Sequence, residues 1–395
     1  MRTVSVQQRR HLIVRRHHLA GDAATSESAV RAVLALHATD PASVYLSVLA
    51  RSAHTSLGDV VDAMYGRRSL VRWMAMRRTL FLLPRDDVPV VQAAVSTPVA
   101  ATLRRQLVAK LERNGSRPPV TGDVREWLRD LEGRVEDAVR VRGAATGAEL
   151  ASDVPALRTV IPPRASSDRP QAVTSPLLTI MGADGRLVRG TPTGPWTSRH
   201  HRWEPVERWW PEGMPVPDPT EARRTLAYLY LARFGPATAD DFAWWTGWSK
   251  TTVRHALEHV AAEEVDLHGE TGLALPDNLA DDDLPDEADA PVATLLPALD
   301  PTPMGWKRRE WLLGIDRRHL FDSAGNIGPT LWWAGEVIGS WAVTATGDIR
   351  IAVIADRGAE AGRAIQDAAA RIQDRLDGTP ITPAARTPLE QSLHQ

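Results

Sequence analysis

The pattern of apolar and polar residues divides this chain of 395 residues into a long helical part and a shorter β-rich part. Up to about residue 260, apolar residues mostly recur three and four positions apart, which is typical of helices with one buried face. After residue 290 they come in short runs separated by glycine, proline and aspartate, which is typical of strands. The pattern therefore predicts an α+β protein that is mainly α-helical.

Residues 220–275 carry the clearest local pattern. They contain three helical segments and then a segment able to form a small hairpin, at 223–234, 238–245, 250–263 and 265–275. Gly235-Pro236 and Gly247 separate the helices. This is the order of a winged helix-turn-helix, in which Lys250 and Arg254 stand on the recognition helix. Such a module either binds DNA or packs against another domain.

The same order recurs twice upstream without obvious sequence identity. The first copy has predicted helices at 3–20, 26–38, 42–53 and 57–65 and a hairpin at 70–83. The second has helices at 90–112, 123–131, 134–140 and 147–154 and a hairpin formed by 175–180 and 186–190. The β-rich part has strand-like runs at 292–296, 311–314, 331–333, 336–343 and 349–354 and a closing helix at 359–376. We thus predict modules at 1–88, 89–212 and 218–278, a β-rich domain at 290–377 and a loose tail at 378–395.

Three groups able to handle protons lie close together in what we call the 37–40 corner. His37 falls on the buried face of the helix predicted over 26–38, where that helix must end before Pro41. Thr39 and Asp40 follow, and Pro41 suits the first position of the next helix. Two interpretations stay open: Asp40 caps that helix and His37 is a core residue, or the three groups form a catalytic site.

Positive charge is concentrated in two stretches, although the net charge of the chain is only −2. Residues 66–85 contain six arginines and no acidic residue, and residues 185–203 contain four arginines and two histidines. Seven acidic residues instead cluster at 277–289. Because a phosphate backbone responds to the local field, the basic stretches predict DNA contacts. The alternative is a solvated or ion-paired strand surface, since alternate residues of a strand point to opposite sides.

The composition excludes several kinds of chemistry. The chain has no cysteine, which excludes disulfides, thiolate nucleophiles and cysteine-bound metal, and fits a reducing cytosol. No histidine pair has the spacing of a helical metal site, and none of the three lysines is near the 37–40 corner. No apolar stretch is long enough to span a bilayer, and the N-terminal residues lack the apolar region of a signal peptide. We expect a cytoplasmic protein without metal or cofactor.

Four features occur together in one order along the chain: the 37–40 corner before Pro41, RRTLF at 77–81, DFAWWTGW at 241–248, and LLPALD at 295–300 followed by GWKR at 305–308 and GN at 325–326. In these features the chain resembles bacterial winged-helix DNA glycosylases of the AlkZ/YcaQ type over nearly its whole length. The resemblance implies three tandem winged helices plus a C-terminal β-barrel-like domain that grip duplex DNA with a basic surface. It also implies removal of alkylated purines, including bulky and crosslinked adducts. The Gln-x-Gln or Gln-x-Asp pair of the family corresponds to His37 and Thr39 here.

The leading functional prediction is a monofunctional glycosylase that removes N3- or N7-alkylated purines from duplex DNA, in base excision repair, as a monomer at the nucleoid. His37 would orient or deprotonate the attacking water, Asp40 would hold the imidazole or stabilise the sugar cation, and Thr39 would add a hydrogen bond. The predicted DNA-binding residues are Arg67, Arg68, Arg72, Arg77, Arg78, Arg186, Arg189, Arg199, His200, Arg202, Lys250 and Arg254. The alternative is a non-catalytic DNA-binding protein, either a lesion sensor or a transcriptional regulator.

Overall fold

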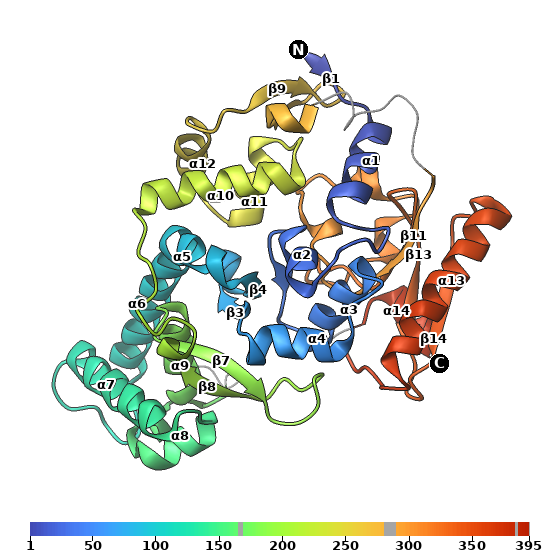
Figure 1. Cartoon of the computed structure of the whole chain (residues 1–395). Helices are drawn as coiled ribbons and strands as arrows, with labels where there is room; N and C mark the ends of the chain where they lie inside the picture. The colour runs from blue at the N-terminus through green and yellow to red at the C-terminus, as the bar shows by residue number, and fades with distance from the viewer. Residues whose placement is uncertain (165–168, 280–289, 384–385, 395) are drawn as a thin grey trace. The chain divides into compact units, whose positions relative to one another are not determined.

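The computed structural model describes residues 1–164, 169–279, 290–383 and 386–394, and it combines many helices with small sheets, as predicted (Figure 1). The chain divides into two compact units. The first consists of Met1–Leu70, Phe81–Pro84 and Arg223–Gln395, and the second of Val71–Leu80 and Arg85–Ala222. These bounds cut across the predicted first module, because residues 71–80 belong to the second unit. None of the described helices is long and apolar enough to cross a membrane.

The N-terminal part of the first unit is helical. It contains α1 (Val6–Arg16), α2 (Ser26–Arg31), α3 (Pro41–Arg51) and α4 (Leu57–Val61), which a π-helical turn (Asp62–Gly66) extends. Ser5, Thr25 and Ser56 begin three of these helices with capping boxes. Every residue of α3 is buried, because α2, α4 and strand β11 all pack against it. Helix α3 therefore holds the 37–40 corner on a rigid support.

The single helix predicted over 26–38 is wrong in its second half. Helix α2 ends at Arg31, and Leu34 takes a left-handed conformation with φ of 63°. The chain then continues as strand β2 (Leu36–His37), which pairs antiparallel with β4 (Leu80–Pro84). The apolar run 32–36 is buried throughout, so its spacing could not distinguish a helix from an interior strand. His37 consequently lies on a strand and not at a helix end.

Residues 219–274 confirm the predicted order of helix, short helix, turn, helix and hairpin. The elements are α10 (Pro219–Phe234), α11 (Ala239–Thr246), α12 (Lys250–Leu257), β9 (Glu263–Asp266) and β10 (Thr271–Ala274). Gly247 makes the turn with φ of 76°, a conformation that favours glycine, and Ser249 caps α12. Strand β1 (Arg2–Thr3) adds parallel to β9 and completes a three-stranded sheet.

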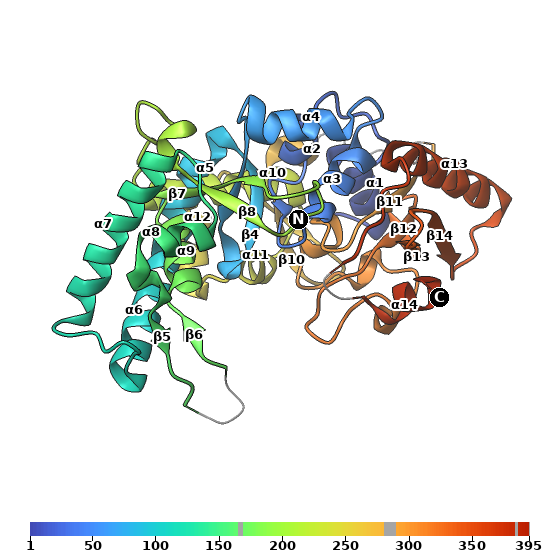
Figure 2. The ribbon, with the colours of Figure 1, turned by 90° about the horizontal axis from the view of Figure 1, so that it is seen from below.

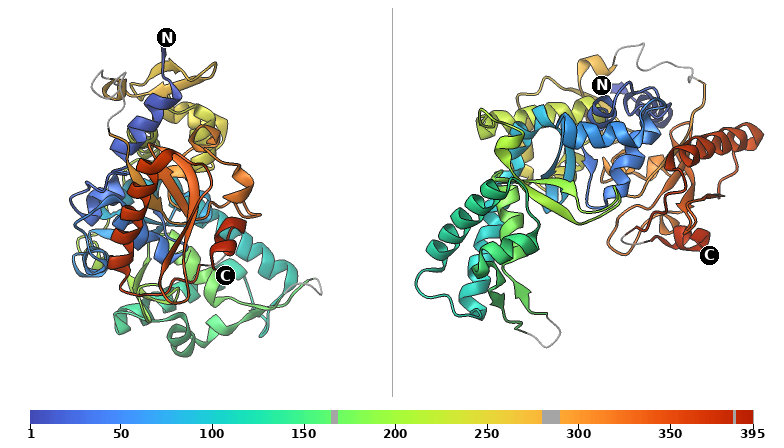
Figure 3. Two further views of the ribbon diagram at one scale, coloured as in Figure 1. Left: turned by 90° about the vertical axis from the view of Figure 1, so that its right-hand side faces the viewer. Right: turned by 60° about the horizontal axis from the view of Figure 1, so that its bottom comes forward.

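The C-terminal part is an antiparallel sheet of four strands in sequence order. They are β11 (Ala293–Leu296), β12 (Thr330–Trp333), β13 (Glu336–Val343) and β14 (Ile349–Val353). Helix α13 (Gly358–Leu376) lies along β11 and β12, and α14 (Pro388–His394) lies against β13 and β14 (Figure 3). Among the described strands no further pairing closes this sheet into the barrel that the resemblance implies.

Two predictions for this part differ from the structure. The run 311–314, predicted as a strand, contains the 3-10 helix Glu310–Leu312 and adds only an isolated bridge to the sheet. The tail predicted as loose carries α14 and buries Ile381, Thr387 and Glu390. Its few apolar residues gave too weak a pattern for a helix to be predicted. Most of the acidic stretch 277–289 lies outside the described residues.

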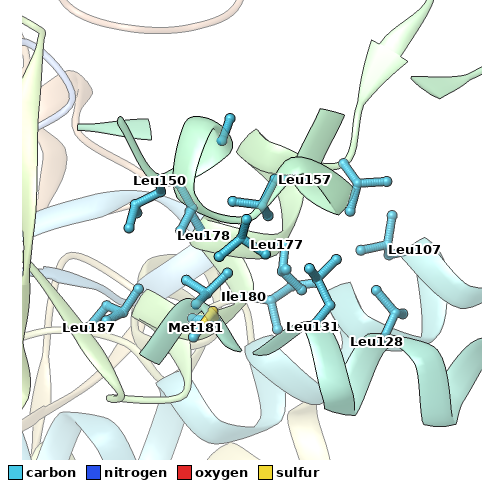
Figure 4. Close-up of a cluster of buried hydrophobic side chains, with 14 of the residues drawn as sticks. Leu107, Leu128, Leu131, Leu150, Leu157, Leu177, Leu178, Ile180, Met181 and Leu187 are labelled. Atoms are coloured by element: carbon cyan, nitrogen blue, oxygen red, sulfur yellow. The ribbon is translucent and has the colours of Figure 1, made fainter. Parts of the chain in front are cut away.

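The second unit is a helical body with two small strand pairs (Figure 2). It contains α5 (Val88–Val91), a π-helical turn (Gln92–Ser96), α6 (Thr97–Asn114), α7 (Val124–Arg142), α8 (Gly147–Asp153), α9 (Thr174–Ala183), β5 (Val160–Ile161), β6 (Gln171–Ala172), β7 (Leu187–Pro192) and β8 (His201–Pro205). Strand β3 (Leu70–Met74) ends in this unit. Leucine, isoleucine and valine side chains from α6 to α9 form its core (Figure 4).

Two predictions for the second unit also need correction. The segments 123–131 and 134–140 form one helix, α7, because Gly133 does not interrupt it. The segment 175–180, predicted as a strand, belongs to helix α9, so the hairpin is formed by β7 and β8 instead. The side chains of 177–181 are mostly buried around the helix, which hides the helical period.

Within the described parts of the chain, the remaining regular segments are short 3-10 helices. They are Met76–Arg78, Arg85–Asp87, Pro155–Arg158, Val206–Arg208, Pro276–Leu279, Thr302–Met304, Glu310–Leu312 and Arg317–His319.

Candidate active site and nucleic-acid interface

The 37–40 corner joins strand β2 to the buried helix α3. His37 is half-buried, and its ring lies 5.2 Å from the ring of Phe81 on β4, with an angle of 60° between the planes. Thr39 is exposed, whereas Asp40 is buried. The Thr39 hydroxyl is thus accessible from solvent and the imidazole only in part, since its Nδ1 is buried, while the carboxylate is held inside.

Asp40 caps helix α3, as one of the two interpretations predicted. Its Oδ1 accepts a hydrogen bond of 3.2 Å from the backbone N–H of Ala42, and Pro41 occupies the first turn. This role does not exclude a chemical one, because a carboxylate has several acceptor positions on two oxygens. A cap also fixes the side chain relative to the helix. The geometry therefore supplies a rigid carboxylate three residues beyond a half-buried imidazole.

Arg77 and Arg78 form the tip of the turn between β3 and β4. Both take left-handed conformations, with φ of 52° and 60°, which are uncommon for residues other than glycine. Both side chains are exposed, and Arg78 donates to Gln106 of α6 over 3.4 Å. Partial burial lowers the pKa of the Arg77 guanidinium. Because strained backbone tends to occur at functional sites, this tip is a strong candidate for contact with DNA.

The predicted DNA-binding residues of the first unit are engaged by acidic neighbours to different degrees. Arg67 pairs with Glu27 over 3.0 Å and also with Asp62. On the recognition helix, Lys250 lies 3.5 Å from Asp240, and Arg254 lies 3.6 Å from Glu258. These exposed pairs are weak and can exchange for phosphate. Arg68 is half-buried and has a left-handed φ of 55°.

Several predicted residues of the second unit have structural partners. Arg72 is buried and donates to the carbonyl oxygen of Gly190 over 2.7 Å. Arg186 bridges Glu132 and Glu136 over 2.6 and 2.5 Å. Arg202 pairs with Glu149 over 3.1 Å. These contacts favour the ion-paired interpretation for Arg186 and Arg202 and an interior role for Arg72.

The remaining predicted residues lie on or near the loop between β7 and β8. The Arg189 guanidinium lies 5.1 Å from the ring centre of Trp203, and burial, aided by the charge of Arg72, lowers its pKa to about 10. Arg199 and His200 are exposed in the loop itself. This loop is therefore the second outward-facing basic site of the unit, after the turn at Arg77 and Arg78.

A basic groove on helix α6 was missed by the sequence reasoning. It has a volume of about 590 Å³, and its charged lining residues are all cationic: Arg105, Lys110, Arg113 and Arg164. Gln106, which accepts from Arg78, lines the same groove, so the groove adjoins the Arg77–Arg78 turn within one unit. Its signal in the sequence is the set of cations along 104–113, which lies outside the two arginine-rich stretches.

A second missed feature is Glu390, which lines a cavity together with Asp40. It lies in the segment predicted as a loose tail, so no functional role was considered for it. Among the described residues, no group of three histidine, aspartate or glutamate side chains is placed to hold a metal ion.

Comparison with known proteins places this geometry in a family. Residues 30–375 match the family model described as DNA glycosylase AlkZ-like. The solved structure of Streptomyces sahachiroi DNA glycosylase AlkZ superimposes with a TM-score of 0.72 and 20% sequence identity, over 96% of this chain and 99% of that one. No curated protein matches the chain. Since the family match covers most of the chain and includes the 37–40 corner, the chain belongs to the AlkZ-like DNA glycosylase family.

Proposed function

We propose that this protein is a monofunctional DNA glycosylase that hydrolyses the N-glycosidic bond of N3- or N7-alkylated purines in duplex DNA. The observation that carries the proposal is the 37–40 corner, where a half-buried imidazole and a buried, fixed carboxylate stand within a chain of this family. The proposed setting is base excision repair, with the protein acting as a monomer.

The reaction requires little machinery. The oxygen of water forms a bond to C1′ while the C1′–N bond breaks. The electron pair of the C1′–N bond goes to the departing purine. Alkylation at N3 or N7 gives the purine a positive charge, so it leaves as a neutral base without needing an acid. The transition state has oxocarbenium character, which a nearby carboxylate stabilises. His37 accepts the proton of the water, Asp40 supplies the negative charge, and Thr39 donates a hydrogen bond to the water.

The basic surfaces support binding of a duplex. The turn at Arg77 and Arg78, the groove on α6 and the loop at Arg199 and His200 all present cations to solvent. We propose that they contact phosphates, which fix the register of the protein on DNA without reading sequence. The segment 219–274 supports the same proposal, since its order of elements is that of a winged helix with α12 as recognition helix.

The test is release of purine base from methylated or mustard-treated duplex DNA. Wild type should release base, and His37→Ala should lower the rate about 10²- to 10⁴-fold, the usual contribution of general-base catalysis. Asp40→Asn keeps an acceptor for the cap but removes the charge, so it should also lose activity while remaining folded. Arg363→Ala, an exposed change on α13, serves as the matched control.

The outcomes separate the enzyme from its rival. If the protein binds duplex DNA but releases no base from any alkylated substrate, the enzyme proposal fails, and a lesion sensor or transcriptional regulator takes its place. A regulator should in addition prefer one unmodified sequence. If His37→Ala releases base at the wild-type rate, the function stands and the assignment of His37 fails.

A further inference from the structure

A small cavity next to Asp40 is lined partly by the C-terminal residues. Its volume is about 30 Å³, room for about two water molecules. Asp40 and Ser43 line it from the start of α3, Trp341 from β13, and Ile381 and Glu390 from the C-terminal segment. The cavity is therefore too small for a nucleotide, but its size and polar groups suit bound water.

Glu390 is buried in this cavity with one carboxylate oxygen unsatisfied. Its side chain is 5% exposed, and its Oε1 lies 3.7 Å from Nε of Arg386. Its Oε2 is buried and has no hydrogen-bond partner among the described residues. A buried carboxylate oxygen without a partner is costly, so a water molecule in the adjoining cavity is its natural partner. The residue lies beyond the stretch 30–375 that matches the family, so the family match does not supply it.

Burial makes the protonated form of Glu390 accessible near neutral pH, and the neighbouring groups modify this effect. Burial raises the pKa of Glu390 to about 7, the charge of Arg386 and a hydrogen bond from the backbone N–H of Thr387 oppose the shift, and the charge of Asp40 adds to it.

The other elements packed against α14 supply further charged groups. Strand β14 carries Arg350, and the 3-10 helix Arg317–His319 carries two arginines and a histidine. Arg317 pairs with Glu310, and Arg318 pairs with Asp316. Strand β13 faces the cavity with the uncharged residues 341–343. Asp40 and Arg386 are therefore the charges that govern Glu390.

We propose that Glu390 is a positioning residue of the hydrolytic site: in its protonated form it donates, through a water molecule in this cavity, to the Asp40 carboxylate and so holds that carboxylate in place. Loss of the proton replaces a donor by a second negative charge near the Asp40 carboxylate, which the hydrogen bond from Ala42 then orients without this support. The C-terminal helix α14 is thereby part of the active site. The proposal rests on the proposed function, in which Asp40 stabilises the sugar cation.

The first test is the pH dependence of base release under single-turnover conditions, corrected for spontaneous depurination. The wild-type rate should fall about tenfold per pH unit above pH 7, since only the protonated form is competent. Glu390→Gln keeps a neutral donor at every pH, so it should match wild type at pH 6 and lack the fall at pH 8. Glu390→Ala should be slow throughout. Glu360→Gln, an exposed change on α13, should behave as wild type.

Two results of this test would overturn the proposal. One is a Glu390→Gln profile with the wild-type fall above pH 7. The other is a Glu390→Gln variant as slow as Glu390→Ala at all pH values, which would make the residue merely structural.

The second test needs no DNA and so separates this proposal from the proposed function. Carboxyl ¹³C NMR of the full chain, with Glu390→Gln to identify the signal, should show Glu390 titrating near pH 7. Asp40→Asn should lower that pKa by removing the neighbouring charge. Titration near the ordinary value of 4.5, or no response to Asp40→Asn, overturns the pairing even if base is released. Conversely, Glu390 could titrate as expected while the protein releases no base from any substrate. In that case the proposed function fails and the proposed pairing of Glu390 with Asp40 stands.

Discussion

Arg51 and Asp300 form a fully buried ion pair that joins α3 to the segment after β11. The two guanidinium N–H groups donate to the two carboxylate oxygens over 2.7 Å each, and both side chains have no exposed area. Ser47 and the backbone N–H of Thr302 also donate to Asp300, over 2.7 and 2.9 Å. Burial alone would raise the pKa of Asp300, but the charge and hydrogen bonds of Arg51 lower it overall. Both members are thus charged in the folded state and depend on each other.

We expect Arg51→Ala to destabilise the protein by about 3–5 kcal/mol, because it leaves a buried carboxylate without its partner. Urea unfolding at pH 7 measures the effect. Arg51→Met combined with Asp300→Leu should recover much of the loss, since no buried charge then remains. Arg363→Ala should shift stability by less than about 0.5 kcal/mol. If Arg51→Ala shifts it no more than this control does, the pair carries no net stability.

His17 extends this network and should make stability depend on pH. Its Nε2–H donates to the carbonyl oxygen of Arg233 over 3.1 Å, so Nδ1 accepts from the Thr302 hydroxyl over 2.9 Å. Burial, then the charge of Arg51, lowers the pKa of His17 from 6.5 to about 3. Below pH 6.5, His17 therefore becomes protonated in the unfolded chain but stays neutral in the folded chain. Stability from this residue is complete above pH 6.5 and falls by about 1.4 kcal/mol per pH unit below it.

Comparison of wild type with His17→Gln isolates this effect. The amide keeps a donor and an acceptor but does not titrate, so the variant should lose the decline between pH 6.5 and 5. Urea unfolding at several pH values in this window measures both slopes. The raised pKa of Glu390 increases stability as the pH falls, which is opposite to the effect of His17. Because wild type and His17→Gln both contain Glu390, this contribution is the same in the two proteins. Parallel slopes for the two proteins would contradict a neutral, buried His17.

At the scale of single residues, the sequence predicted the members of the corner but not their surroundings. Asp40 before Pro41 identified the cap, because this pairing has a local cause. Arg72 bonds to Gly190, 118 positions away, and Glu390 lines a cavity with Asp40, 350 positions away. No local pattern carries such contacts. The sequence therefore indicated which charged residues were candidates for function, but it did not predict which of them are buried in the folded protein.

At the scale of elements, helix α6 should be a main contact for the DNA backbone. Its groove presents Arg105, Lys110 and Arg113, and within the described residues none of these three forms an ion pair. Lys110 donates to Gln171, an uncharged group, over 2.7 Å. Cations without acidic partners give the most to phosphate binding, because no existing pair must be broken.

We expect Arg105→Ala and Arg113→Ala each to reduce the salt dependence of DNA binding by about one unit in the slope of log K against log salt. Binding titrations on unmodified duplex between about 50 and about 200 mM salt measure this slope, because several phosphate contacts change the affinity by orders of magnitude over that range. Arg129→Ala, on an exposed site of α7 that is paired with Glu126, should leave it unchanged. An equal effect from Arg129→Ala would indicate a general charge effect and no specific groove. An unchanged slope in all three variants would remove α6 from the interface.

Elements with one buried face were predicted well, and elements buried on all sides were not. The capped helix α11 and the strands β11 to β14 lie close to their predicted bounds, and α12 begins as predicted but ends at Leu257, six residues before the predicted end. The errors at β2 and α9 occur where apolar residues are continuous. In such a run, apolar and polar residues alternate neither every two positions, as in a strand, nor every 3.6 positions, as in a helix. Local chemistry thus sets most elements, whereas those in the interior are set by packing.

At the scale of the whole molecule, the second unit should fold on its own. It has its own core, which gathers the apolar residues of α6 to α9, β7 and β8, among them Leu131, Leu177 and Trp203. Strand β3 is tied into the same unit by Trp73, whose indole N–H donates to Gln92 over 2.9 Å, and by the bond from Arg72 to Gly190. A fragment of residues 71–222 keeps all of these contacts and lies within the usual size of a domain.

This fragment should unfold in one cooperative thermal transition, monitored by circular dichroism, and should give a dispersed amide NMR spectrum. It retains the Arg77–Arg78 turn, the α6 groove and the β7–β8 loop, so we expect salt-dependent binding to duplex DNA. It lacks His37 and Asp40, and it should therefore release no base from alkylated DNA. A gradual transition without NMR dispersion would show that the unit depends on the rest of the chain. Base release by the fragment would show that residues outside the 37–40 corner catalyse the reaction, which would contradict the proposed active site.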